Sequence, residues 1–492
     1  MQAATPTPAP PLAAGAPTRA GASAPVWLIR VLGAAGLIAV LVSTFGIAAG
    51  AAGAPNVYVP ARVGGWPSWL AGPLSSFSLS ISGSSFQTLT LVGCAGYLLV
   101  LLAARSIAWR LLAATIVIAH VILILGPPLI SQDVFGYLAF ARMGALHGLD
   151  PYTRIPAEAA LDPVYQFIGW PFLHSPYGPL FTIASYATAP LGPAGGLWVL
   201  KAVTGLASLA AIALIARAAG RLGHSARWAA AFVGLNPVLL VLAVGGAHND
   251  TIVMLLMALA LAMTAGAGER PRAAAASLAA GVGVKITAGL VLPFMLLGVR
   301  DRRERTRASV AAAAMLAALA AIGVIGFGGH ALGFLDAVSE QQQLVATHSI
   351  PAESARLLGL SGTPTWWRHL FILAFLVAFV FSLWRTARGA DWRVWAGWAT
   401  IALLLTTAWL LPWYTLWLLP LAAVCGDRRL RAATLVFCAW AVLIHLPFAE
   451  PVLSPTIPKQ HSYKGLRVPA ARHRLELTSF QILRDIDLDL RW

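Results

Sequence analysis

The sequence predicts an all-α, polytopic integral membrane protein, and two observations carry this prediction. Of the 492 residues, 59% are hydrophobic and only 11% are charged, whereas soluble domains carry about 25% charged residues. Apolar runs long enough to cross a bilayer recur along most of the chain, and a helix satisfies its own backbone hydrogen bonds in lipid. The net charge of +16 does not indicate nucleic acid binding, because the arginines lie in short clusters between the apolar runs.

The apolar runs divide the chain into a short N-terminal segment, a transmembrane domain and a tail. Residues 1–26 are rich in Ala, Pro and Thr, which predicts a disordered cytoplasmic N-terminus. A transmembrane domain is predicted over 27–448, and we assign no role to the tail at 449–492. Runs long enough to cross occupy 27–52, 87–104, 111–130, 196–216, 228–244, 250–266, 308–328, 368–386, 394–411 and 430–448. With the interrupted runs, we expect about 11–13 transmembrane helices, a re-entrant hairpin and outer juxtamembrane helices.

The arginine clusters orient the helices, because loops rich in Lys and Arg stay in the cytoplasm. The loops without such clusters would then face outward; they are 54–86, 131–177, 245–249 and 329–367. Only one full crossing fits between the outer loop at 131–177 and the cytoplasmic Arg217, and we assign it to 196–216. The short apolar run at 178–192 is then predicted to be interfacial or re-entrant.

The run at 273–299 is predicted to enter the membrane and return. Arg272 and Arg300 flank it, and both should be cytoplasmic. Two glycines and a lysine lie near its middle: Gly281, Gly283 and Lys285. An unwound backbone at this depth must line a cavity or be buried in protein, which places Lys285 in an internal polar cavity. One straight helix is the alternative, and it would leave the arginines after 299 outside.

Asp133 is the predicted catalytic residue, in the outer loop at 131–177. It follows an apolar run that ends at the outer surface, where a carboxylate can accept a proton from a substrate at the interface. Helical spacing after it also makes Asp133 a candidate N-cap, and the two roles are compatible. Arg142, further along this helix, is a candidate ligand for phosphate, or else extends to the interface.

Two other outer segments carry polar side chains. His174 and Tyr177 lie in a rigid turn with two prolines and a glycine, and they either contact a sugar or only shape the turn. His248, Asn249 and Asp250 join two apolar helices, so their side chains need hydrogen-bond partners. Asp250 is a candidate cap of the next helix, whereas His248 and Asn249 are expected to face a cavity. This cluster alone does not establish a metal site.

Lys285 and the aromatic residues after Leu411 complete the candidate site. An ionisable side chain within a membrane segment indicates function, and we expect Lys285 to face an anion, either a lipid phosphate or Asp133. A purely structural salt bridge is the alternative. Trp413 and Tyr414 follow a proline at the outer end of a helix. They belong to the interfacial aromatic belt or stack on a sugar or polyprenyl chain.

These features together resemble a known family. The pattern Asp-Val-Phe-Gly-Tyr from Asp133 to Tyr137, Asp-Pro-Tyr ending at Tyr152, the His-Asn-Asp loop and the Lys285 hairpin are similar to the actinobacterial polyprenol-phosphate-mannose-dependent α-(1→6)-mannopyranosyltransferases, the MptA/MptB family. The resemblance covers roughly 27–448 and implies the GT-C membrane fold. It also implies that 131–177 is the first catalytic outer loop.

The resemblance implies a reaction and a role for each residue. Mannose would pass from polyprenyl-phosphate-mannose to a growing α-(1→6) mannan on a lipid anchor, with inversion, at the outer face of the plasma membrane, in lipomannan and lipoarabinomannan core synthesis. Asp133 would be the general base, and Lys285, Arg142 and His248 would bind the donor phosphate. Sugar and acceptor contacts would come from Tyr137, Tyr152, His174, Tyr177, Asn249, Asp250, Trp413 and Tyr414. No cofactor is implied, and a divalent metal is left open.

Two other functions fit part of the sequence. A transporter or flippase of a lipid-linked sugar would share the apolar bulk, the intramembrane Lys285 and the aromatic helix ends, but would not need a base at Asp133. A non-catalytic partner in envelope synthesis would need none of the polar candidates. Replacement of Asp133 by Asn separates the transporter from the enzyme, and a combined change of Asp133, His248 and Lys285 separates the non-catalytic partner.

Overall fold

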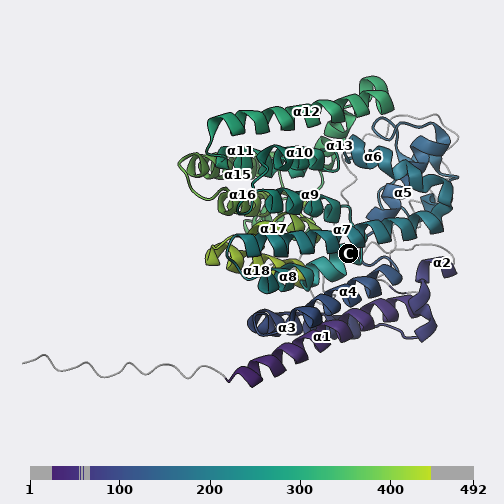
Figure 1. Cartoon of the computed structure of the whole chain (residues 1–492). Coiled ribbons are helices and arrows are strands. Elements are labelled where there is room, and N and C mark those ends of the chain that lie inside the picture. Colours follow the sequence, from purple (N-terminus) through teal and green to yellow (C-terminus); the bar gives the residue numbers. More distant parts are fainter. Residues whose placement is uncertain (1–24, 55, 57–58, 60–66, 445–492) are drawn as a thin grey trace, which may run out of the picture.

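In the computed structural model, the described residues are 25–54, 56, 59 and 67–444. Every element of secondary structure in this part of the chain is a helix, so the predicted all-α class is confirmed. The tail at 449–492 and all but the end of the predicted N-terminal segment lie outside the described residues. Figure 1 shows helices stacked side by side, with a cap of shorter elements around α5 (Asp133–His147) and α6 (Pro179–Ser185) at one end.

The long helices establish a polytopic membrane protein. Within the described ranges, five stretches are long and apolar enough to cross: α1 (Val26–Gly53), α3 (Gly83–Ala103), Pro179–Arg221, Arg302–His330 and α15 (Thr365–Ala387). A sixth candidate is the pair of α8 (Ala226–Gly234) and the π-helix η5 (Val238–Val244), bent by 45°. Shorter apolar helices occupy Trp109–Leu125 (α4), Asp250–Met263 (α9), Ile286–Gly298 and Pro412–Val424. The finer count of about 11–13 transmembrane helices stays a prediction.

Helices occupy the remaining predicted crossings and the outer cap. The crossing predicted at 196–216 lies within α7 (Gly192–Arg221), and those at 394–411 and 430–448 overlap α16 (Trp392–Thr406) and α18 (Arg428–Leu443). The short outer helices α13 (Gly333–Gln341) and α14 (Ile350–Leu357) lie in the predicted outer loop at 329–367.

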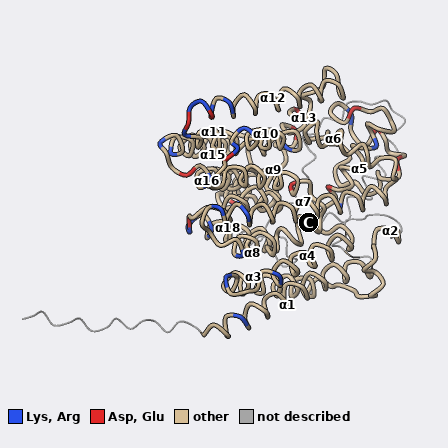
Figure 2. Tube along the Cα trace, in the orientation of Figure 1, with Lys and Arg blue, Asp and Glu red and all other residues tan. Residues whose placement is uncertain are grey.

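Basic residues gather at one end of the stack. Figure 2 shows Lys and Arg concentrated at the ends of α12 (Arg302–Phe327), α15, α16 and α18 that lie opposite the cap of α5 and α6. This is the segregation that the positive-inside rule requires. The predicted inner clusters therefore share one end, and the predicted outer loop at 131–177 lies at the other.

The segment at 273–299 is a hairpin, as predicted. It consists of α10 (Pro271–Val282), a break at 283–285, the 3₁₀-helix η6 (Ile286–Val291) and α11 (Leu292–Gly298). Lys285 has an extended backbone at the break. Arg272, in the first turn of α10, forms an ion pair of 2.9 Å with Glu304, in the first turn of α12. The chain thus returns to the end at which it entered, so the straight-helix alternative is wrong.

The predicted interfacial or re-entrant run at 178–192 forms α6 and the 3₁₀-helix η4 (Tyr186–Leu191), directly before α7. Its start pairs with the break of the hairpin: the Gly178 N–H donates to the Val284 carbonyl at 3.1 Å, and the Phe181 N–H donates to the Gly283 carbonyl at 3.0 Å. Such pairing satisfies backbone groups that neither segment uses in a helix. The outer cap is therefore joined to the hairpin by main-chain bonds.

Candidate active site

Two irregular segments bring Asp133 and His248 together. Asp133 follows α4 through a stretch with two prolines, and His248 follows the π-helix η5. The segments pair through the Leu129 N–H, which donates to the Gly245 carbonyl at 3.0 Å. Each contains a non-glycine residue with positive φ, namely Ile130 (69°) and Ala247 (56°). Such backbone is uncommon for L-residues and recurs where a site demands an exact geometry.

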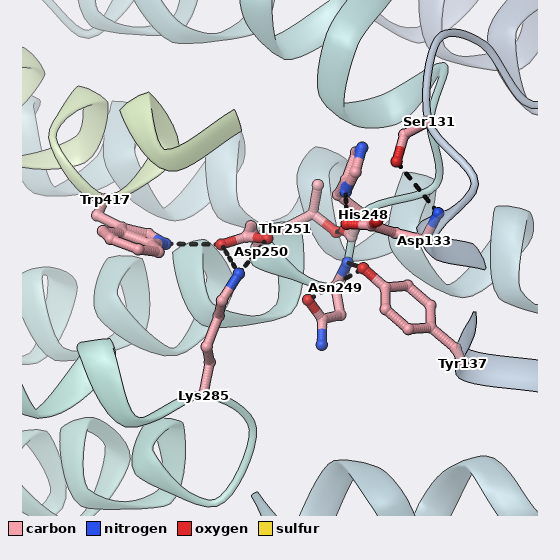
Figure 3. Close-up of polar contacts among 9 residues, drawn as sticks. All are labelled: Ser131, Asp133, Tyr137, His248, Asn249, Asp250, Thr251, Lys285 and Trp417. Atoms are coloured by element: carbon pink, nitrogen blue, oxygen red, sulfur yellow. Dashed lines mark hydrogen bonds and ion pairs between the residues drawn. The ribbon is translucent and has the colours of Figure 1, made fainter. Parts of the chain in front are cut away.

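The carboxylate of Asp133 faces the imidazole of His248. Asp133 Oδ2 lies 3.3 Å from His248 Nδ1, and the two side chains are 16% and 0% exposed. The distance between these two atoms is that of an ion pair, but their orientation does not meet the geometry of a hydrogen bond. Figure 3 shows Asp133 between His248 and Ser131, whose hydroxyl accepts a 3.1 Å bond from the Asp133 N–H. Asp133 therefore combines access to a substrate with a buried, ionisable neighbour.

The predicted capping roles of both aspartates are wrong. Asp133 is the first residue of α5, the N-cap position belongs to Gln132, and the end has no side-chain cap. Asp250 is likewise the first residue of α9, after Asn249, and that end also lacks a side-chain cap. The two carboxylates point to other partners than the helix N–H groups, so capping does not account for them.

His248 is held by stacking. Its ring lies 3.6 Å from that of Trp413, between centroids, with the planes inclined by 21°. Trp413 belongs to the 3₁₀-helix η8 (Pro412–Trp417). Within the described residues, both ring nitrogens of His248 and Nε1 of Trp413 are buried without a hydrogen-bond partner. Buried polar atoms are rarely left unpaired, so these atoms make this part of the structure a candidate ligand site.

Asn249 and two tyrosines line the next part of the site. The Tyr137 hydroxyl donates to Asn249 Oδ1 at 3.3 Å and accepts from the Asn249 N–H at 3.4 Å. The Asn249 amide nitrogen is buried and has no partner in the described part of the chain. Tyr177 packs edge-on against Tyr137, with centroids 5.0 Å apart. Asn249 thus offers an unused donor pair beside an aromatic wall.

Lys285 is paired with Asp250, which differs from the two partners predicted. Lys285 Nζ lies 3.0 Å from both carboxylate oxygens of Asp250, and the Trp417 indole donates to Asp250 Oδ1 at 2.7 Å (Figure 3). The ammonium also lies over the rings of Tyr414 (4.7 Å) and Trp417 (5.4 Å). Asp250 is fully buried, whereas Lys285 remains 14% exposed. The structural salt bridge that was the alternative is therefore present.

Three predicted site residues have their main contacts elsewhere. Arg142 Nε donates to both oxygens of Asp162 at 2.9 Å, and its Nη1 donates to the Ala189 carbonyl. The Tyr152 hydroxyl donates to the Tyr177 carbonyl at 2.9 Å. His174 Nδ1 lies 3.0 Å from Glu340. These contacts stabilise the outer cap, so they give no support to phosphate binding by Arg142.

Sequence reasoning missed two polar contributors near the site. Trp417 is not among the predicted site residues, although its indole reaches Asp250. Lys201 is also absent from the predicted site residues, yet it lies within the crossing at 196–216 and is fully buried. A lysine inside a membrane helix is itself a signal for function and could have identified this residue.

The fold and the site are those expected of a membrane enzyme. A partly exposed carboxylate and unpaired buried polar atoms lie at the end of a helix bundle. In the described ranges, no group of three His, Cys, Asp or Glu side chains is placed to hold a metal ion. Comparisons with known proteins give the particular family. A model of the α-(1→6)-mannopyranosyltransferase N-terminal domain matches residues 30–300, and the MptB C-terminal domain matches residues 357–458.

Individual relatives agree with the family match. The chain is 30% identical over 370 residues to α-(1→6)-mannopyranosyltransferase A of Mycobacterium tuberculosis, which covers 68% of this chain and 69% of the relative. It is 32% identical over 157 residues to a protein of Mycolicibacterium smegmatis named probable α-(1→6)-mannopyranosyltransferase, covering 29% and 27%. No solved structure matches. The chain belongs to the MptA/MptB family, and it is an α-1,6-mannosyltransferase.

Proposed function

We propose that this chain transfers mannose from polyprenyl-phosphate-mannose to a growing α-(1→6)-linked mannan on a lipid anchor, in lipomannan and lipoarabinomannan core synthesis. The reaction takes place with inversion at the extracytoplasmic face of the plasma membrane, on a GT-C fold. The observation that carries the proposal is the partly exposed Asp133 carboxylate, 3.3 Å from the buried His248, at the start of the outer helix α5.

The chemistry is a single displacement. The 6-hydroxyl oxygen of the acceptor mannose forms a bond to the anomeric carbon of the donor, and the bond from that carbon to the phosphate oxygen breaks. Asp133 accepts the hydroxyl proton. The polyprenyl phosphate leaves with the bonding electron pair and needs no proton. Attack on the face opposite the phosphate converts a β-linked donor into an α-linked product.

Two side chains of the site, Lys285 and His248, are assigned to the departing phosphate. Lys285 has three N–H donors, of which Asp250 occupies two, so one remains for a phosphate oxygen. His248 offers a buried ring nitrogen without a partner, in a water-poor setting where charge stabilisation is strong. Arg142 is assigned instead to the outer cap, because Asp162 and Ala189 take its donors.

The sugars are assigned to the aromatic and amide groups beside Asp133. Tyr137, Tyr177 and Asn249 contact one another, Trp413 stacks on His248, and the Tyr414 ring lies under the Lys285 ammonium. Aromatic faces stack on the apolar faces of sugar rings, and an amide bonds hydroxyl groups. This lining supports a carbohydrate substrate better than an apolar one. Tyr152 and His174 shape the cap around it.

The test is transfer of radiolabelled mannose from polyprenyl-phosphate-mannose to a short α-(1→6) mannoside lipid. Wild type and Asp133→Asn are compared with Asp391→Asn, which keeps an N-cap side chain at the basic end of α16. We expect Asp133→Asn to lose transfer by about 10²- to 10⁴-fold, with donor binding retained, and Asp391→Asn to stay active. Unchanged transfer by Asp133→Asn would remove this residue from the mechanism. No transfer by any protein would reject the donor or the acceptor.

A further inference from the structure

Lys201 is a fully buried lysine that the proposed reaction does not use. It lies in α7 with 0% of its surface exposed. Its Nζ donates to two main-chain carbonyls, of Gly245 at 3.2 Å and of Pro127 at 3.3 Å. No carboxylate pairs with it within the described ranges. A lysine in the interior of a membrane protein is costly and is retained where it serves a function.

The two carbonyls belong to the two segments that carry the reacting side chains. Pro127 lies in the stretch that leads from α4 to Asp133, and Gly245 lies in the loop that leads from η5 to His248. The Gly245 carbonyl also accepts the Leu129 N–H, so one oxygen joins α7 and both segments. Lys201 therefore links the Asp133 segment to the His248 segment through their main chains.

Both segments need such a restraint, because their backbones are held in an unfavourable conformation. Ile130 and Ala247 have φ values of 69° and 56°, and a β-branched residue such as Ile130 is a marked exception in that region. Residues in such conformations persist only where the surrounding structure fixes them, and they cluster at functional sites. The Lys201 donors fix the chain ahead of both residues, at Pro127 and at Gly245.

We propose that Lys201 is a positioning residue, which sets the separation of the Asp133 carboxylate and the His248 imidazole by holding the carbonyls of Pro127 and Gly245 together. This inference rests on the proposed function of Asp133. The role differs from that of Lys285, which reaches the site itself. Lys201 acts through the backbone, so its removal should impair the chemical step more than substrate binding.

The experiment compares Lys201→Met, Lys201→Gln and Thr204→Val in the purified full-length protein, with mannose transfer as the readout. Met removes all donors at similar length, and Gln keeps a shorter donor. Thr204 is the matched control: it is buried in the same helix, and among the described residues its hydroxyl bonds only the carbonyls of Leu200 and Lys201 in that helix. Size-exclusion profile and thermal midpoint report the folding of each variant.

We expect Lys201→Met to lower kcat by about 10²-fold, because small misplacement of reacting groups has this effect. The donor KM should change by less than about threefold. The kcat of Lys201→Gln should lie between those of Lys201→Met and wild type, and the kcat of Thr204→Val should match that of wild type. In the Asp133→Asn background, Lys201→Met should add less than about twofold, because the two residues act on one step.

Three results would overturn the positioning role. They are a wild-type kcat for folded Lys201→Met, a raised KM with unchanged kcat, and an undiminished effect of Lys201→Met in the Asp133→Asn background. If Lys201→Met does not fold, the kcat and KM of Lys201→Gln test the positioning role by the same criteria. Wild-type activity of Asp133→Asn itself would instead reject the proposed base, which separates the two failures.

Discussion

The imidazole of His248 lies flat on the indole of Trp413, with ring centroids 3.6 Å apart and planes inclined by 21°. Stacking fixes the plane of the imidazole without using either ring nitrogen, and both are buried without a hydrogen-bond partner in the described structure. The ring is thus oriented by packing, while Nδ1 faces Asp133 and Nε2 stays available to a substrate. This arrangement predicts that a substitution of His248 can keep the stacked ring and remove its nitrogens. The contributions of the ring and of the nitrogens can then be measured separately.

His248→Phe should keep the stack on Trp413 and remove both nitrogens. We expect the thermal midpoint to stay near that of wild type and mannose transfer to fall by about 10²-fold, the usual contribution of a positioned acid–base or charged group. The control is His369→Phe, at an exposed position of α15, which should leave the rate unchanged. Wild-type transfer by His248→Phe would show that the nitrogens take no part.

Lys285→Met should destabilise the protein more than the combined Lys285→Met and Asp250→Asn change. The single variant leaves the fully buried Asp250 carboxylate with only the Trp417 indole as a partner, and breaking a buried pair on one side costs about 3–5 kcal/mol. Neutralising Asp250 as well removes that uncompensated charge. Denaturant unfolding in detergent measures both variants, and a double variant that is less stable than Lys285→Met would contradict the prediction.

Gly178→Ala should destabilise the junction of the outer cap and the hairpin. A Cβ at Gly178 would lie 2.5 Å from the carbonyl carbon and oxygen of Gly283. Because these are backbone atoms, which cannot rotate away, the free energy of unfolding should fall by about 1–3 kcal/mol. Gly136→Ala in α5 is the control, because no atom lies within 4 Å of its Cβ. It should stabilise the helix by about 0.5–1 kcal/mol. Equal unfolding midpoints for both variants would disprove the close contact.

His174 should make the outer cap more stable at low pH. His174 Nδ1 donates a hydrogen bond to the Glu340 carboxylate, which raises the pKa of His174 above its ordinary value of 6.5, although partial burial acts in the opposite direction. Because the folded-state pKa is the higher one, the added stability is fully present below pH 6.5 and is lost as the pH rises through the folded-state value.

The measurement for His174 is the unfolding midpoint of wild type and of His174→Gln from pH 5 to pH 9. The advantage of wild type should be largest at the acid end and shrink toward the alkaline end, and it should disappear in the Glu340→Gln background. If the stability advantage of wild type over His174→Gln grew as the pH rises, the prediction would be contradicted.

The sequence predicted the elements of the fold because hydrophobicity and arginine clusters report directly on membrane helices. The hairpin was predicted from Gly281, Gly283 and Lys285, and the structure breaks the helix at that point. The sequence also brought Asp133 and His248 into one hypothesis, although they lie far apart along the chain. That hypothesis rested on motif resemblance, which carries information about spatial neighbours that periodicity alone lacks.

The sequence did not predict which charged side chains pair with each other. Asp250 and Asp133 are both aspartates at a helix start, and only packing decides that Lys285 meets Asp250. The same limit explains Arg142, whose partner Asp162 lies in the irregular outer loop. Local rules favoured capping for both aspartates, but tertiary contacts supplied stronger partners than the helix N–H groups.

The ion pair of Asp250 and Lys285 has a consequence for biosynthesis. A lysine that enters the bilayer by itself costs about 2.5–3.5 kcal/mol at the membrane centre. Asp250 precedes Lys285 along the chain, and the break that carries Lys285 lies between α10 and η6, so the counter-charge is made before the lysine emerges from the ribosome. Insertion of α9 together with the hairpin, with Asp250 and Lys285 paired, is therefore favoured over insertion of either segment in isolation.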